Sequence, residues 1–200
     1  MEKKPKQKKK NSNNKWILQI FIMSFFISLG FSFGSEIVLS KVGAIVGSII
    51  LISVILFGVL FDMIGTAVTS ADIGPFNSMS ARKVRGADIA VMFKKNAEKV
   101  SSFCNDVIGD ICGIISGSAG VTVALSLSKA FNIDLMIVTL IVTGIVASLT
   151  IGGKAIGKGL AIKNNTNILY GFAKFVSFFY KIKKETFIKV FFVNNNIGDK

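Results

Sequence analysis

Histidine is absent from this 200-residue sequence, which has only two cysteines, two prolines and one tryptophan. Without histidine, imidazole catalysis and histidine-ligated zinc or haem are not expected. Cys104 and Cys112 lie eight positions apart on one expected helix, or about 12 Å along its axis, which is too far for a disulfide. No nucleophile–base constellation is visible, so we predict that the protein is not an enzyme and has no resident cofactor.

Acidic residues are also few: 11, against 24 lysines and arginines, which gives a net charge of +13, although 51% of the chain is hydrophobic. Uncharged apolar runs cover residues 16–34, 42–61, 111–128 and 135–153. About 20 helical residues cross a hydrocarbon core of roughly 30 Å. We therefore predict an all-α, polytopic membrane protein with four spans. The first run could instead be a signal peptide, but it is long and no small-residue cleavage site follows it.

Lysine and arginine alternate with these runs. Seven lysines precede the first run, six basic residues lie between the second and third, and nine lysines follow the fourth. The two other connections hold one lysine each, Lys41 and Lys129. The positive-inside rule then predicts a multi-pass protein of the cell membrane with both termini cytoplasmic. The basic residues suit anionic lipids of the bilayer, whereas nucleic acid is a poor partner because no soluble fold or interleaved aromatic motif accompanies them.

Composition divides the chain into four parts. They are a disordered basic tail (residues 1–15), a first transmembrane helix (16–34), a main domain that begins at residue 42 and holds the other three runs, and a basic C-terminal tail (183–200). Within the main domain we expect a helix break at residues 73–75, a cytoplasmic helix over 81–100 capped by Ser80, and a helix interruption at 152–153. Residues 168–193 mix aromatic residues with lysine, which predicts an amphipathic helix in the membrane interface.

Polar side chains recur at helical spacing within the apolar runs. Asp62 and Thr66 share one helix face, and Ser102, Asp106 and Asp110 share another. A carboxylate at membrane depth costs several kcal/mol unless it is paired, hydrated or metal-bound, and oxygen ligands suit Mg²⁺. The alternative is that these acids lie in interfacial water or pair with Lys154, and that the threonines bond their own helix backbone.

Three segments, in this order, resemble the transmembrane domain of the CorB/CorC and cyclin-M family of magnesium and cobalt transporters. They are Phe61-Asp-Met-Ile-Gly-Thr66-Ala67, Ser101-Ser102-Phe-Cys-Asn105-Asp106-Val-Ile-Gly-Asp110 and Gly153-Lys154-Ala-Ile-Gly157-Lys158-Gly-Leu-Ala161. The resemblance covers about residues 42–182. It implies a three-span domain, to which residues 16–34 add a span and the C-terminal segment an amphipathic helix. The family's paired glutamates correspond to Gly65 and Lys154, and its regulatory CBS domain has no counterpart here.

The resemblance implies a homodimer that transports Mg²⁺ or Co²⁺ through a polar intramembrane site. The corresponding metal-site candidates are Asp62, Thr66, Ser102, Asn105, Asp106, Asp110 and backbone oxygen near Gly153, with Lys154 as a charge partner. Movement at the interrupted helix would expose this site to each side alternately. The alternative function is a non-transporting membrane subunit or regulator that keeps the fold with a degenerate ion site.

Overall fold

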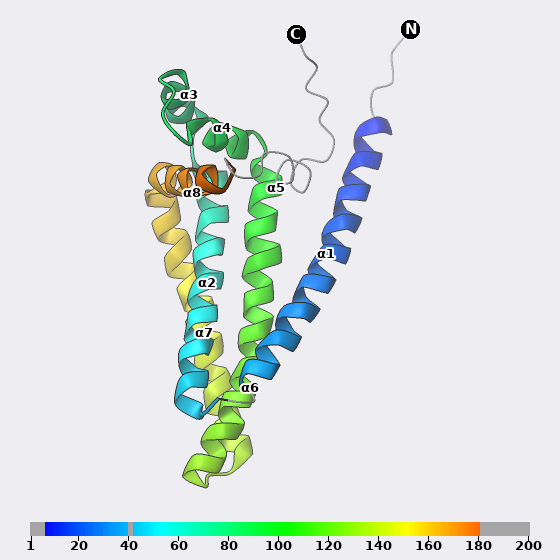
Figure 1. Ribbon diagram of the computed structural model, residues 1–200, viewed down its shortest axis with the longest axis vertical. Helices are drawn as coiled ribbons and strands as arrows, with labels where there is room; N and C mark the ends of the chain where they lie inside the picture. Colours follow the sequence, from blue (N-terminus) through cyan, green and yellow to red (C-terminus); the bar gives the residue numbers. More distant parts are fainter. Residues whose placement is uncertain (1–6, 40–41, 181–200) are drawn as a thin grey trace. The chain divides into compact units, whose positions relative to one another are not determined.

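The structure is a computed structural model that describes residues 7–39 and 42–180. Helices make up this part of the chain, in agreement with the predicted all-α class (Figure 1). In chain order they are α1 (Gln7–Leu39), α2 (Ala44–Ser70), α3 (Ile73–Ala81), α4 (Ala87–Lys95), α5 (Ala97–Ser102), the π-helix η1 (Phe103–Gly109), α6 (Asp110–Phe131), α7 (Leu135–Lys163) and α8 (Asn165–Tyr180).

Three helices are long and apolar enough to cross a membrane: α2, α7 and the continuous helix Ala97–Phe131 formed by α5, η1 and α6. Many of their large apolar side chains are exposed, for example Ile49, Ile141 and Leu149. Such surfaces are unfavourable in water and favourable in lipid. Three of the four predicted spans are thus supported. In α1 the apolar stretch is shorter, Phe21–Ser35, and a membrane-spanning role for residues 16–34 stays a prediction.

Helix α1 is longer than the sequence indicated. It begins at Gln7, inside the expected tail, and continues to Leu39, beyond the helix predicted over residues 16–34. Lysine and glutamine at residues 7–10 are good helix formers, although the asparagines and serine of residues 11–14 are poorer ones. The tail assigned to residues 183–200 lies outside the described residues.

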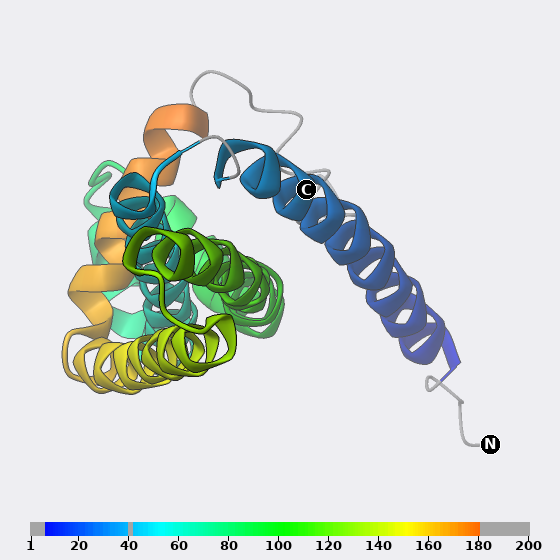
Figure 2. The same cartoon turned by 90° about the horizontal axis from the view of Figure 1, so that it is seen from below.

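The chain forms two compact units, which are described separately. Unit 1 consists of Met1–Gly58 and Asp110–Thr150. Within it, α6 and the first part of α7 run side by side as a helical hairpin (Figure 2), and a Cβ on Gly120 would lie 3.3 Å from Val146. The chain turns at Asn132, which has φ 53°, and the Asp134 carboxylate caps α7 by accepting a hydrogen bond from the Met136 amide at 2.9 Å.

Unit 2 consists of Val59–Gly109 and Ile151–Lys200. Its core joins the end of α2 to α3, α4, α5, η1 and α8 (Figure 1). The buried members are Val68, Ala71, Phe76, Ile89, Ala90, Phe93, Val100, Cys104, Leu169, Ala173 and Val176. The last three recur along one face of α8, which makes the described part of the predicted amphipathic segment a packed helix. The rest of that segment, from residue 181, is outside the described residues.

The helix break after α2 lies earlier than residues 73–75. It occurs at residues 71–72, and Pro75 is the third residue of α3. Proline is tolerated there because the first amides of a helix have no intrahelical acceptor. The prediction was therefore right about a break and wrong about its position.

The single cytoplasmic helix predicted over residues 81–100 is also wrong. Ser80 is inside α3, where its hydroxyl contacts the Asp88 carboxylate. The chain then turns through Lys83 (φ 55°) and Gly86 (φ 87°), and Gly86 precedes α4. These left-handed conformations cannot continue an α-helix, and a second break at Asn96 separates α4 from α5.

Helix α7 continues through Gly152 and Gly153 without interruption, so the interruption predicted there is wrong. A glycine inside a helix costs roughly 1 kcal/mol relative to alanine, which lowers its stability without ending it. The benefit here is close packing within unit 2: a Cβ on Gly153 would lie 2.9 Å from Cγ2 of Val59 on α2. The movement that was predicted at an interrupted helix therefore has no helix break at residues 152–153.

Candidate functional site

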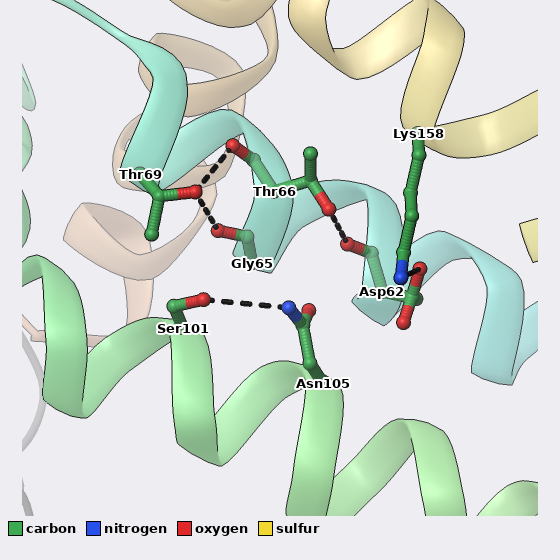
Figure 3. Close-up of polar contacts among 7 residues, drawn as sticks. All are labelled: Asp62, Gly65, Thr66, Thr69, Ser101, Asn105 and Lys158. Atoms are coloured by element: carbon green, nitrogen blue, oxygen red, sulfur yellow. Dashed lines mark hydrogen bonds and ion pairs between the residues drawn. The ribbon is translucent and has the colours of Figure 1, made fainter. Parts of the chain in front are cut away.

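The polar site of unit 2 is built around Asp62, a residue of α2 with only 3% of its surface exposed. The Lys158 ammonium of α7 lies 3.7 Å from Asp62 Oδ2 (Figure 3). This separation is an ion pair rather than a hydrogen bond, and within the described residues Oδ2 accepts no hydrogen bond. Asp62 thus has a counter-ion, which lowers the cost of burying a carboxylate in a candidate membrane span.

Lys158 reaches Asp62 because two glycines let α7 approach α2 closely. A Cβ on Gly157 would lie 3.3 Å from Cγ1 of Val59 and 3.7 Å from Cβ of Met63, and Gly153 is tighter still. Small residues spaced four apart allow helix backbones to approach in this way. The close approach brings Lys158, the residue after Gly157, to the side of Asp62. The Lys158 side chain remains 51% exposed.

A second contact joins α2 to η1. A Cβ placed on Gly65 would lie 2.0 Å from Oδ1 of Asn105, so the Asn105 amide occupies the space that any larger residue would fill. Asn105 Nδ2 donates to Ser101 Oγ at 3.3 Å (Figure 3). Oδ1 itself is buried and, within the described residues, accepts no hydrogen bond.

Asn105 and Asp106 lie in the π-helix η1. This helix type changes which side chains share the helix face that was predicted for Ser102, Asp106 and Asp110. An i→i+5 hydrogen-bond pattern shifts the register relative to an α-helix, so Ser102, Asp106 and Asp110 do not share one buried face as their spacing suggested. Ser102 is half-buried and Asp106 is exposed. Asp110 belongs to unit 1, where it is exposed. In unit 2 the contact with α2 therefore comes from Asn105.

Threonines within the apolar runs bond to their own helices. Thr66 Oγ1 donates to the Asp62 carbonyl at 2.9 Å, and Thr143 Oγ1 donates to the Thr139 carbonyl at 2.7 Å. This is the local pattern that the sequence left open as an alternative. The carbonyl of Gly153 lies inside a continuous α-helix, where it accepts an intrahelical hydrogen bond. Lys154 is half-buried.

Among residues 7–39 and 42–180, no three His, Cys, Asp or Glu side chains gather as a metal site. Cys104 and Cys112 are buried and are not joined by a disulfide, as expected from their spacing. The oxygens that unit 2 brings to its polar site are the Asp62 carboxylate and the Asn105 amide, with Lys158 Nζ as the cation beside Asp62. The metal assignment of the predicted residues remains a prediction.

Lys158 is a site residue that the sequence analysis did not include; the charge partner named there, Lys154, stays a prediction. A signal was present, since Lys158 directly follows Gly157, and glycines at 153 and 157 mark a face for close helix packing. Asp62 lies one residue before Met63, which packs on that face.

Comparison of the chain with protein-family models, curated proteins and solved structures gave no match. The resemblance to the CorB/CorC and cyclin-M family therefore rests on the quoted sequence segments alone.

Proposed function

We propose that this chain is an integral membrane protein whose cation-site-like polar cluster is occupied by its own Lys158, and that it acts as a non-transporting membrane subunit or regulator. The observation that supports this proposal is the 3.7 Å separation between Lys158 Nζ and Asp62 Oδ2. A tethered ammonium has a high effective concentration at the carboxylate, so a free cation would have to displace it.

The charge balance of the site supports the same proposal. Asp62 is the buried carboxylate of the described spans, and one lysine neutralises it. A divalent ion in place of the lysine would bring two positive charges to a single carboxylate. One of them would be uncompensated in a low-dielectric environment, which is costly. The surrounding threonine hydroxyls already donate to helix carbonyls.

Transport of Mg²⁺ or Co²⁺ is the second candidate, and one observation favours it. Asp62 Oδ2 and Asn105 Oδ1 are both buried oxygens that accept no hydrogen bond within the described residues. Hard oxygens left without donors are what Mg²⁺ or a similar cation would complete. In this alternative Lys158, half of which is exposed, would swing away to admit the ion. Kinship with CorB/CorC transporters and a homodimeric state are proposals that fit either candidate.

The proposed setting is the cell membrane, with both termini cytoplasmic. The distribution of lysine and arginine supports this topology. It would place the end of α2 and the beginning of α8 on the cytoplasmic side, facing an anionic leaflet.

Flux measurements in proteoliposomes separate the two candidates. Mg²⁺ and Co²⁺ uptake is measured for the wild type, Lys158→Met and Asp62→Asn, under gradients that drive a known transporter. We expect wild-type flux equal to that of empty vesicles. Asp72→Asn is the matched control, because Asp72 is an exposed acid shortly after Asp62 on the chain. Wild-type flux above empty vesicles that Asp62→Asn abolishes and Asp72→Asn preserves would overturn the non-transporting role and establish transport.

A further inference from the structure

Helix α8 presents two unlike faces. Leu169, Ala173 and Val176 are buried in the core of unit 2. On the other side, Phe175 and Phe178 are 63% and 59% exposed, and Lys174 between the two faces is exposed as well. Two exposed phenylalanines beside a lysine are unusual on a helix that has already buried its apolar face.

The beginning of α8 is attached to the ends of two candidate membrane spans. Only Asn164 separates it from α7. The Asn165 side chain donates from Nδ2 to the carbonyl of Ser70, the last residue of α2, at 3.2 Å. Figure 1 shows α8 running across the ends of α2 and α7. A helix that starts where two spans end and crosses them lies at the level of the lipid headgroups.

A basic turn packs against the same helix. It connects α3 to α4 and carries Arg82, Lys83 and Arg85, all exposed. The Tyr170 hydroxyl of α8 donates to the Arg85 carbonyl at 3.3 Å. A Cβ on Gly86 would lie 2.9 Å from the Lys174 Cα, so the turn and the Lys174 backbone are in close contact.

We infer that these residues form a docking surface for anionic lipid headgroups. The basic–aromatic surface comprises Arg82, Lys83, Arg85, Lys174, Phe175 and Phe178. Its cations match the phosphates of an anionic leaflet, while its two phenylalanine rings enter the boundary between headgroups and acyl chains. The attachment of α8 to two span ends favours lipid over a soluble acidic protein, because it holds this surface at the bilayer. A second copy of the chain and a protein partner are the competing occupants.

The first test locates Phe178. The sequence has a single tryptophan, Trp16, so Trp16→Phe combined with Phe178→Trp gives a full-length reporter. It is reconstituted in phosphatidylcholine–phosphatidylglycerol vesicles containing lipids brominated near the headgroup end of the acyl chains. We expect strong quenching by the bromolipid and weak quenching by aqueous acrylamide. Ile141→Trp in the same Trp16→Phe background is the control, since Ile141 is an exposed residue inside a candidate span.

The second test measures lipid charge selectivity. With the same reporter, we expect brominated phosphatidylglycerol to quench about twofold more than brominated phosphatidylcholine at equal content. Arg82→Glu with Arg85→Glu should bring this ratio to about one, and Lys174→Glu should lower it. The matched control is Lys95→Glu with Lys129→Glu, which makes the same charge change at exposed residues outside the surface.

Three results would overturn the inference. Quenching of the reporter by acrylamide alone places Phe178 in water. Protection from both quenchers places it under protein, either a second copy or another partner. If the ratio of quenching by brominated phosphatidylglycerol to quenching by brominated phosphatidylcholine falls equally in the control variant, the selectivity comes from overall charge and not from this surface.

Discussion

The ammonium of Lys158 and the carboxylate of Asp62 lie 3.7 Å apart, yet the lysine side chain is 51% exposed and the aspartate side chain only 5%. The two partners therefore contribute unequally. Asp62 loses most of its hydration inside α2, whereas Lys158 keeps part of its own, so removal of the lysine should be more damaging than removal of the acid's charge.

Lys158→Met should destabilise the protein because it leaves a buried carboxylate without a counter-ion. Breaking a fully buried pair from one side costs about 3–5 kcal/mol, and the exposure of Lys158 reduces the expected loss to about 1–3 kcal/mol. Asp62→Asn should cost less, and the double variant should recover much of the loss. Unfolding in mixed micelles measures all three. Lys163→Met, at the exposed end of α7, is the control, and an equal effect there would contradict the pairing.

Gly65→Ala should destabilise unit 2, because the new methyl group would lie 2.0 Å from Oδ1 of Asn105. Overpacking of this kind costs typically about 1–3 kcal/mol. Gly144→Ala on α7 is the matched control, since no neighbouring atom lies within 4 Å of its Cβ position. Thermal unfolding in nanodiscs measures both. Asn105→Ala in the Gly65→Ala background should restore stability; no recovery would show that the two residues do not clash.

The helical class and three spans could be predicted because each depends on a local property. Twenty uncharged apolar residues in a row specify a spanning helix whatever surrounds them. The break after α2 was predicted for the same reason, from the local chemistry of proline. The interruption at Gly152–Gly153 was wrong because glycine was read as a local breaker, whereas its role in α7 is a contact with Val59 of a helix distant in sequence.

The polar site was predictable only in part. Asp62 was identified because burying a charged carboxylate within an apolar run costs free energy. Its contact with Lys158 was not predicted, because the lysine of α7 that reaches Asp62 depends on the rotation of α7 against α2. The π-helix at Phe103–Gly109 was missed as well. Spacing arguments assume an α-helical period, so they could not separate Asn105, which contacts Gly65 of α2, from Asp106, which is exposed.

Gly86→Ala should loosen α8 from the basic turn. The residue has φ 87°, which costs a non-glycine residue roughly 1–2 kcal/mol, and its Cβ would lie 2.9 Å from the Lys174 backbone. Trypsin cleavage after Lys174 reports local opening of α8, and we expect faster cleavage in the variant. Gly171→Ala is the control on α8 itself, because its Cβ position is open. Equal cleavage rates in the two variants would contradict a role for Gly86 in seating α8.

Leu169→Ala tests whether α8 is part of the core of unit 2. Leu169 is fully buried among residues of α2, α3 and α4, and truncating a buried leucine costs about 2–5 kcal/mol. Leu160→Ala is the matched control, since Leu160 on α7 is 49% exposed and its truncation should cost about 1 kcal/mol or less. Unfolding in mixed micelles compares the two variants. If Leu169→Ala cost no more than Leu160→Ala, α8 would not be packed in the core, and the position of its exposed aromatic face would lose its structural basis.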